Sequence, residues 1–194
     1  QAEHILVTAT PDTYRGGYTQ KDGAAGEQYA ADAIRLLDES GKDIGAFISE
    51  TILGCAGQVP LADGYLRALF PAIRERGGVC ILDEVQTGFG RMGDHFWSFE
   101  SQGVLPDIVI LGKPMANGHP MGAVVCTSEV AASFEEGPEF FSSFGGNPVS
   151  CGRGFDGCLP AAGADCHRPD APDSRSHGTY RPSRAGRHPL RRTL

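Results

Sequence analysis

Two residues at the ends of neighbouring apolar runs are placed to do chemistry on a small aromatic cofactor. Asp83 ends the run V-C-I-L-D, and Lys113 follows the run I-V-I-L-G thirty residues later. Buried strands that end in an acid and in an amine bring both groups to one edge of a parallel sheet. The carboxylate can keep a ring nitrogen protonated while the amine forms an imine with an aldehyde. The spacing therefore predicts a site for an aromatic aldehyde cofactor.

The elements that must hold these residues alternate between strands and helices. Apolar, β-branched runs predict strands at His4–Thr8, Ile44–Ser49, Val79–Leu82, Ile108–Leu111 and Ala123–Thr127. Helical periodicity predicts helices at Gly23–Ser40, at Asp63–Arg76 with Asp63 as the N-cap, and at Glu129–Phe134. This alternation predicts an α/β fold, a mostly parallel sheet with helices on both faces. Glu50 then joins Asp83 and Lys113 at the carboxyl edge of the sheet.

Each motif also has a plainer interpretation. Acids such as Asp83 often end strands by capping the next turn, and a single lysine such as Lys113 is usually a solvated surface amine. The segment Gly88–Gly93 matches G-x-G-x-x-G, a dinucleotide pattern, but four residues separate it from the preceding strand. We therefore give the dinucleotide interpretation little weight. What favours chemistry at Asp83 and Lys113 is the residues that follow them.

Three motifs in order resemble one enzyme family. D-E-V-Q-T-G-F-G-R-M-G, then G-K-P-M-A-N-G-H-P, then S-S-F-G-G-N-P are similar to the class III (ω-type) aminotransferases, which are pyridoxal 5′-phosphate enzymes of fold type I. The resemblance covers about residues 1–151 and implies part of the fold type I large domain. Within the family, the branch of alanine–glyoxylate aminotransferase 2 and ethanolamine-phosphate phospho-lyase is the most similar.

The resemblance implies a role for five residues. Lys113 would form the Schiff base with pyridoxal phosphate and shuttle the substrate proton, and Asp83 would pair with the ring nitrogen. Val85 would pack on a ring face, and Gln86 would hydrogen-bond near the ring hydroxyl. Ser143 would donate to the cofactor phosphate of the neighbouring subunit, which implies a homodimer. The resemblance leaves the role of Glu50 open, because Thr51 replaces the commoner Pro, and His119 is either a lining residue of the site or a loop residue bonded to backbone.

Three functions stay open. The first is amino-group transfer from an amino acid or amine to a keto acid. The second is phospho-lysis of a phosphorylated amino alcohol or amino acid, which begins with the same proton removal. The third is a non-catalytic truncated product, because the family's phosphate loop and C-terminal domain have no counterpart here and the chain starts with Gln. We expect no amine turnover by these 194 residues alone.

Composition limits the partners. A net charge of −7 argues against nucleic acid, and no apolar run is long enough to span a bilayer. The six cysteines include no C-x-x-C pair, which favours inert core thiols in a reducing compartment. We expect a cytoplasmic protein, with a mitochondrial one as the alternative. The six histidines show no metal-ligand spacing, so no metal site is predicted.

Residues 152–194 differ from the rest of the chain. This tail has eight Arg, four Asp and no Lys or Glu, which gives it a net charge of +4, and it has no Val, Ile or Met. Such a composition predicts disorder. A basic arm for an acidic partner, a linker and an out-of-frame translation all fit it, and we favour the last. The predicted domain of residues 1–151 therefore ends where this tail begins.

Overall fold

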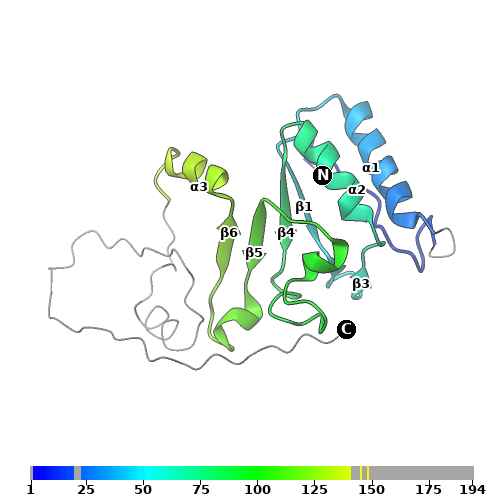
Figure 1. The fold of residues 1–194 in the computed structure, drawn as a ribbon. Coiled ribbons are helices and arrows are strands. Elements are labelled where there is room, and N and C mark those ends of the chain that lie inside the picture. Colours follow the sequence, from blue (N-terminus) through cyan, green and yellow to red (C-terminus); the bar gives the residue numbers. More distant parts are fainter. Residues whose placement is uncertain (1, 20–22, 141–144, 146–147, 149–194) are drawn as a thin grey trace, which may run out of the picture. The chain divides into compact units, whose positions relative to one another are not determined.

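The computed structural model describes residues 2–19, 23–140, 145 and 148 (Figure 1). Its helices are α1 (Ala25–Ser40), α2 (Tyr65–Glu75) and α3 (Ser128–Glu135), with the short 3-10 helices η2 (Ser98–Gln102) and η3 (Lys113–Ala116). One sheet contains β1 (Ala46–Glu50), β4 (Val79–Asp83), β5 (Ile108–Leu111) and β6 (Ala123–Cys126), and a separate hairpin contains β2 (Ile52–Leu53) and β3 (Val59–Pro60). Among the described residues, no helix is long and apolar enough to cross a membrane.

The sheet is mostly parallel, as predicted. Its strand order is β1-β4-β5-β6, with β1, β4 and β5 parallel and β6 antiparallel to β5. The connection from Gly112 to Gly122 holds only the one-turn helix η3, which is too little for a parallel crossover. The chain therefore returns along β6 in the opposite direction, and the loop that carries Lys113 begins and ends at the carboxyl edge of the sheet.

The two faces of the sheet differ in burial. Cys80 and Leu82 of β4 are fully buried on the face where α2 packs, and α1 lies beside α2 (Figure 1). On the other face, Ile48 of β1 is 61% exposed and Val124 of β6 is 65% exposed. The prediction of helices on both faces is thus met on one face within the described residues.

The core forms where α1 and α2 pack together on β4. Its members are buried apolar residues at helical spacing, namely Tyr29, Ala30, Ala33, Leu37, Leu66, Leu69 and Ile73. Gly26 makes the close approach possible, because a Cβ there would lie 1.9 Å from the carbonyl oxygen of Asp63. The helix pair therefore depends on a glycine in the first turn of α1.

Two sequence predictions are wrong. Residues 4–8 form no strand, because a strand needs a ladder partner and none of the described residues pairs with this segment. Asp63 does not cap α2. The N-cap is Gly64 in a left-handed conformation (φ 80°), with no side-chain cap, since the chain turns sharply where it passes Gly26.

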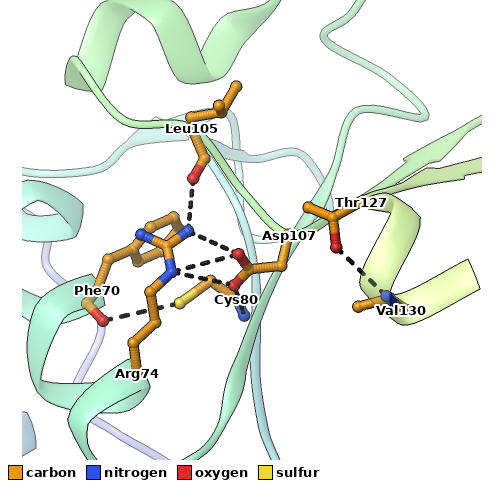
Figure 2. A network of polar contacts seen from close by, with 7 residues as sticks. All are labelled: Phe70, Arg74, Cys80, Leu105, Asp107, Thr127 and Val130. Carbon is orange, nitrogen blue, oxygen red and sulfur yellow. Dashed lines mark hydrogen bonds and ion pairs between the residues drawn. The ribbon is translucent and has the colours of Figure 1, made fainter. Parts of the chain in front are cut away.

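A polar network fixes the amino edge of the sheet (Figure 2). Arg74 of α2 donates to Asp107 through Nη2 at 2.9 Å and also to the carbonyl oxygen of Leu105 at 2.7 Å. Asp107 Oδ2 accepts a hydrogen bond from the backbone N–H of Cys80 at 2.7 Å, and Thr127 N donates to the Asp107 carbonyl oxygen. One carboxylate thus joins α2, β4 and the start of β5, opposite the edge that carries Asp83 and Lys113.

Candidate cofactor site

The carboxyl edge brings together the acids and the amine that the sequence singled out. Glu50 and Asp83 are register neighbours on β1 and β4, and Asp83 is paired with Ile110 on β5. These three residues and Val124 form the last row on the exposed face of the sheet. Lys113 is the second residue after β5, three residues after Ile110. The parallel strands therefore carry both acids and the lysine to one edge.

Asp83 caps a turn and keeps one oxygen free. Its Oδ1 accepts a hydrogen bond from the backbone N–H of Val85 at 2.8 Å, which is the capping role that acids commonly play at strand ends. Its Oδ2 makes no hydrogen bond with the described residues, and the side chain is half-buried. A fixed carboxylate with one free oxygen is suited to accept a hydrogen bond from a protonated ring nitrogen.

The backbone at Lys113 is strained. Lys113 has φ 24°, a positive value that a non-glycine residue rarely adopts, and it starts η3 after Gly112. The side chain is exposed, and within the described residues its ammonium forms no ion pair. Strained residues cluster where a side chain must be aimed at a ligand, so the outlier motivates a functional role for this lysine.

Val85 and Gln86 contact the neighbouring strand ends. A Cβ on Gly112 would lie 3.2 Å from Val85 Cγ1, so Val85 packs on the backbone that leads into Lys113. Gln86 reaches toward β1, because a Cβ on Gly54 would meet Gln86 Nε2 at 2.5 Å and Glu50 Oε2 at 3.2 Å. Glu50 Oε2 also accepts a hydrogen bond from Gly54 N at 3.0 Å. The four candidates within the described residues, Asp83, Val85, Gln86 and Lys113, therefore lie at one edge of the sheet.

Glu84 is a further residue of this edge that no sequence motif indicated. This residue is fully buried, and its carboxylate accepts four hydrogen bonds from Thr87, Ser98 and Phe99. The available signal was the acid pair Asp83-Glu84 at a strand end, because consecutive strand residues point to opposite faces and one of the two acids must then point inward.

The remaining predicted residues have mixed outcomes. Ser143 lies outside the described residues. His119 Nε2 is buried and makes no hydrogen bond to a described group, although its backbone N–H donates to Ala116 O. The segment Gly88–Gly93 is a run of turns that opens no helix, which agrees with the little weight given to a dinucleotide site. Within the described residues, no cluster of three or more His, Cys, Asp or Glu is placed to hold a metal ion.

The aromatic residues beside this edge pack against one another and against the core. Trp97 contacts Phe89 and Phe96 edge-on, with ring centroids 5.1 and 4.8 Å away, and it stacks on Phe99 at 6.3 Å. Phe99 is buried in the core. This cluster therefore supports the loop after β4, as expected for core aromatics.

The residues present fit a pyridine-aldehyde cofactor. Asp83 offers a free carboxylate oxygen, Lys113 an exposed amine and Gln86 an amide, all at the ends of adjacent strands. In open α/β sheets, ligands bind beyond the carboxyl ends of the strands. The donor set therefore suits a ring with a basic nitrogen, a hydroxyl and an aldehyde.

The chain belongs to the class III aminotransferase family, whose model matches residues 2–154. The cofactor of this family is pyridoxal 5′-phosphate. A Drosophila melanogaster protein, alanine–glyoxylate aminotransferase 2-like, is 46% identical over 156 residues, covering 77% of this chain and 32% of the relative. The chain spans about a third of the length of such curated relatives.

Solved structures agree with the family. A phospholyase from Arthrobacter, in complex with phosphoethanolamine, is 38% identical with a TM-score of 0.67, over 78% of this chain and 36% of that one. A PMP-bound aminotransferase from Vibrio fluvialis is 29% identical with a TM-score of 0.67, over 77% and 35% of the two chains. The predicted fold, part of the fold type I large domain, is thereby confirmed.

Proposed function

We propose that this chain carries the cofactor-binding edge of an aminotransferase that moves an amino group from an amino acid or amine to a keto acid. The observation that carries the proposal is the shared row of Glu50 and Asp83 beside β5, whose end leads straight into Lys113. Membership of the class III aminotransferase family supports the proposal that these residues serve amino-group transfer.

Each side chain has a proposed task. Bound pyridoxal phosphate supplies an aldehyde and a ring that accepts electrons from the substrate α-carbon. Lys113 Nζ would hold the cofactor at its aldehyde carbon and, once displaced by the substrate amine, would take and return the proton of the substrate α-carbon. Asp83 Oδ2 holds a proton on the ring nitrogen by charge attraction. Val85 limits ring movement, and Gln86 donates to the ring hydroxyl.

We also propose an assembly and a compartment for the protein. Ser143 is assigned from the resemblance to the cofactor phosphate of a neighbouring subunit, which motivates a homodimer. Buried, unpaired Cys80 and exposed, unpaired Cys55 are consistent with a reducing compartment such as the cytoplasm.

Covalent labelling tests the proposal directly, because the chain has only three lysines: Lys21, Lys42 and Lys113. The chain is mixed with pyridoxal phosphate, reduced with borohydride and mapped by peptide mass spectrometry. We expect the reduced adduct on Lys113, and its loss in Lys113→Arg but not in the matched variant Lys42→Arg. Equal labelling of Lys42 and Lys113 would contradict a dedicated site.

A phospho-lyase is the second candidate. The Arthrobacter phospholyase shares 38% identity, more than the 29% of the Vibrio fluvialis aminotransferase. Both reactions use the same lysine and acid, so the substrates must separate them. Release of inorganic phosphate from phosphoethanolamine without consumption of a keto acid would favour the phospho-lyase, and dependence on a keto acid would favour the aminotransferase.

A further inference from the structure

A buried polar cluster lies beneath the candidate cofactor site. Glu84 is fully buried, and Ser98 Oγ and Phe99 N donate to its Oε1 at 2.5 and 2.9 Å. Thr87 Oγ1 and Ser98 N donate to its Oε2 at 3.0 and 3.1 Å. An ionised carboxylate accepts only, so these donors can satisfy both oxygens inside the protein.

The cluster reaches a second strand end. The hydroxyl of Ser98 is hydrogen-bonded to that of Thr51, which is 3% exposed and directly follows β1. Glu84 itself directly follows β4, and its backbone N–H donates to Ile110 O on β5 at 2.9 Å. The buried hydroxyls and the carboxylate therefore join the ends of β1 and β4, and the Glu84 backbone adds the end of β5.

The alternation of side chains gives the cluster a direction. Glu50 and Asp83 lie on the exposed face of the sheet, and the next residue of each strand end, Thr51 or Glu84, is buried. Consecutive residues of extended backbone point to opposite faces. Anchoring Thr51 and Glu84 on the buried side therefore keeps Glu50 and Asp83 on the cofactor side.

We propose that Glu84, held by Ser98 and linked through it to Thr51, is a positioning residue that aims the Asp83 carboxylate at the cofactor ring. This inference rests on the proposed function, because Asp83 must first be a cofactor ligand. Glu84 does not touch the cofactor. It acts by fixing the backbone between Asp83 and Val85, where the 2.8 Å capping bond orients Asp83 Oδ1.

A double-mutant cycle in the full chain separates positioning from stability. The variants are Asp83→Asn, Glu84→Gln and both together, and the probe is pyridoxal phosphate. Affinity for pyridoxal phosphate is measured by quenching of Trp97 fluorescence. The absorbance of the bound cofactor is followed against pH, and its midpoint is compared between variants. Stability is measured by urea unfolding of the cofactor-free chain. Glu100→Gln is the matched control. Glu100 is an exposed acid on η2, the helix that also carries Ser98, and its carboxylate accepts a hydrogen bond from Trp97 N at 3.0 Å.

We expect Glu84→Gln to weaken pyridoxal phosphate binding about tenfold and to shift the pH midpoint in the same direction as Asp83→Asn. In the Asp83→Asn background the same substitution should change affinity by less than about twofold, since residues acting as one unit are not additive. Thr51→Val, which removes one outer hydroxyl of the cluster, should give a smaller loss of the same kind.

Several outcomes would overturn the inference. Additive losses of affinity in the double variant, or an unchanged pH midpoint in Glu84→Gln, would reduce Glu84 to a stabilising residue. If Glu84→Gln unfolds the chain, Thr51→Val decides, and unchanged affinity in that variant contradicts the proposal. Failure of the unsubstituted chain to bind pyridoxal phosphate would instead overturn the proposed function itself.

Discussion

At the scale of single residues, side chains of the same chemistry have different roles when one is buried and the other is not. Asp83 and Glu84 are adjacent acids, yet one has a free oxygen at the sheet edge and the other is satisfied inside the protein. The sequence singled out Asp83 because an acid at a strand end is a recognisable pattern. It did not single out Glu84, since its partners Ser98 and Phe99 come from a segment that only folding brings near.

The cysteines show the same division. Burial raises the pKa of the Cys80 thiol to about 11, whereas Cys55 is exposed. The thiolate is the reactive form, and a raised pKa keeps it scarce until the pH approaches that value. At pH 8 we expect maleimide to modify Cys55 at least about a hundredfold faster than Cys80 in the folded chain. Peptide mapping over time checks this, and comparable rates at both sites would show that Cys80 is not in a closed core.

At the scale of elements, strand positions were more predictable than strand partners. The run Ile108–Leu111 matches β5 because its apolar residues are continuous, and the helix predicted at Gly23–Ser40 is α1 with a later start. The direction of β6 was not predictable, because the pattern of a strand does not record which way its neighbour runs. The segment His4–Thr8 has strand-like residues and no partner, so local propensity alone was insufficient.

The contact between α1 and the start of α2 has little tolerance. A Cβ on Gly26 would lie 1.9 Å from Asp63 O and 2.7 Å from Tyr65 N, and neither backbone atom can move freely. We expect Gly26→Ala to lower the free energy of unfolding by about 3 kcal/mol, as overpacking does. Gly45→Ala, where nothing lies within 4 Å, should change it by less than about 0.5 kcal/mol. Urea denaturation measures both, and equal stabilities would contradict the close helix contact.

The amino-edge network predicts unequal contributions from its two charged members. Asp107→Ala leaves the Cys80 N–H without its acceptor and leaves the Arg74 guanidinium with only the Leu105 carbonyl oxygen, so we expect a loss of about 2 kcal/mol in the free energy of unfolding. Arg74→Met keeps the packing over Phe70 and removes a partly exposed charge, so we expect a loss below about 1 kcal/mol. A larger effect of Arg74→Met in chemical denaturation would show that the ion pair, and not the Cys80 bond, holds this edge.

At the scale of the whole molecule, the chain is a segment of its family, and helices cover only part of its sheet. It spans about a third of its curated relatives, and Ile48 and Val124 remain exposed on the face that carries the last row of the sheet. The carboxyl edge nevertheless brings Glu50, Asp83 and Lys113 together within this segment. The shared position of Asp83 and Lys113 was predictable from the strand pattern of this segment, whereas their roles, and that of Ser143 across a subunit boundary, stay predictions.

Cofactor binding should stabilise the described fold. A ligand that binds only the folded chain adds about 2.7 kcal/mol at a hundred times its dissociation constant, which corresponds to a rise in Tm of about 7 °C for a chain of this size. We expect pyridoxal phosphate to produce this rise, and Lys113→Ala to abolish most of it. Differential scanning fluorimetry measures the shift, with pyridoxine 5′-phosphate as the control ligand because it keeps the phosphate and lacks the aldehyde. An equal rise with pyridoxine 5′-phosphate would contradict covalent attachment.

The central claim is that Asp83 and Lys113 hold opposite ends of one ring at the carboxyl edge of the sheet. A crystal structure of the full chain after reduction with borohydride in the presence of pyridoxal phosphate tests it most directly. We predict continuous density from Lys113 Nζ to the cofactor and an Asp83 carboxylate oxygen about 2.8 Å from the ring nitrogen. A cofactor attached elsewhere, or a ring nitrogen that faces away from Asp83, would contradict the account.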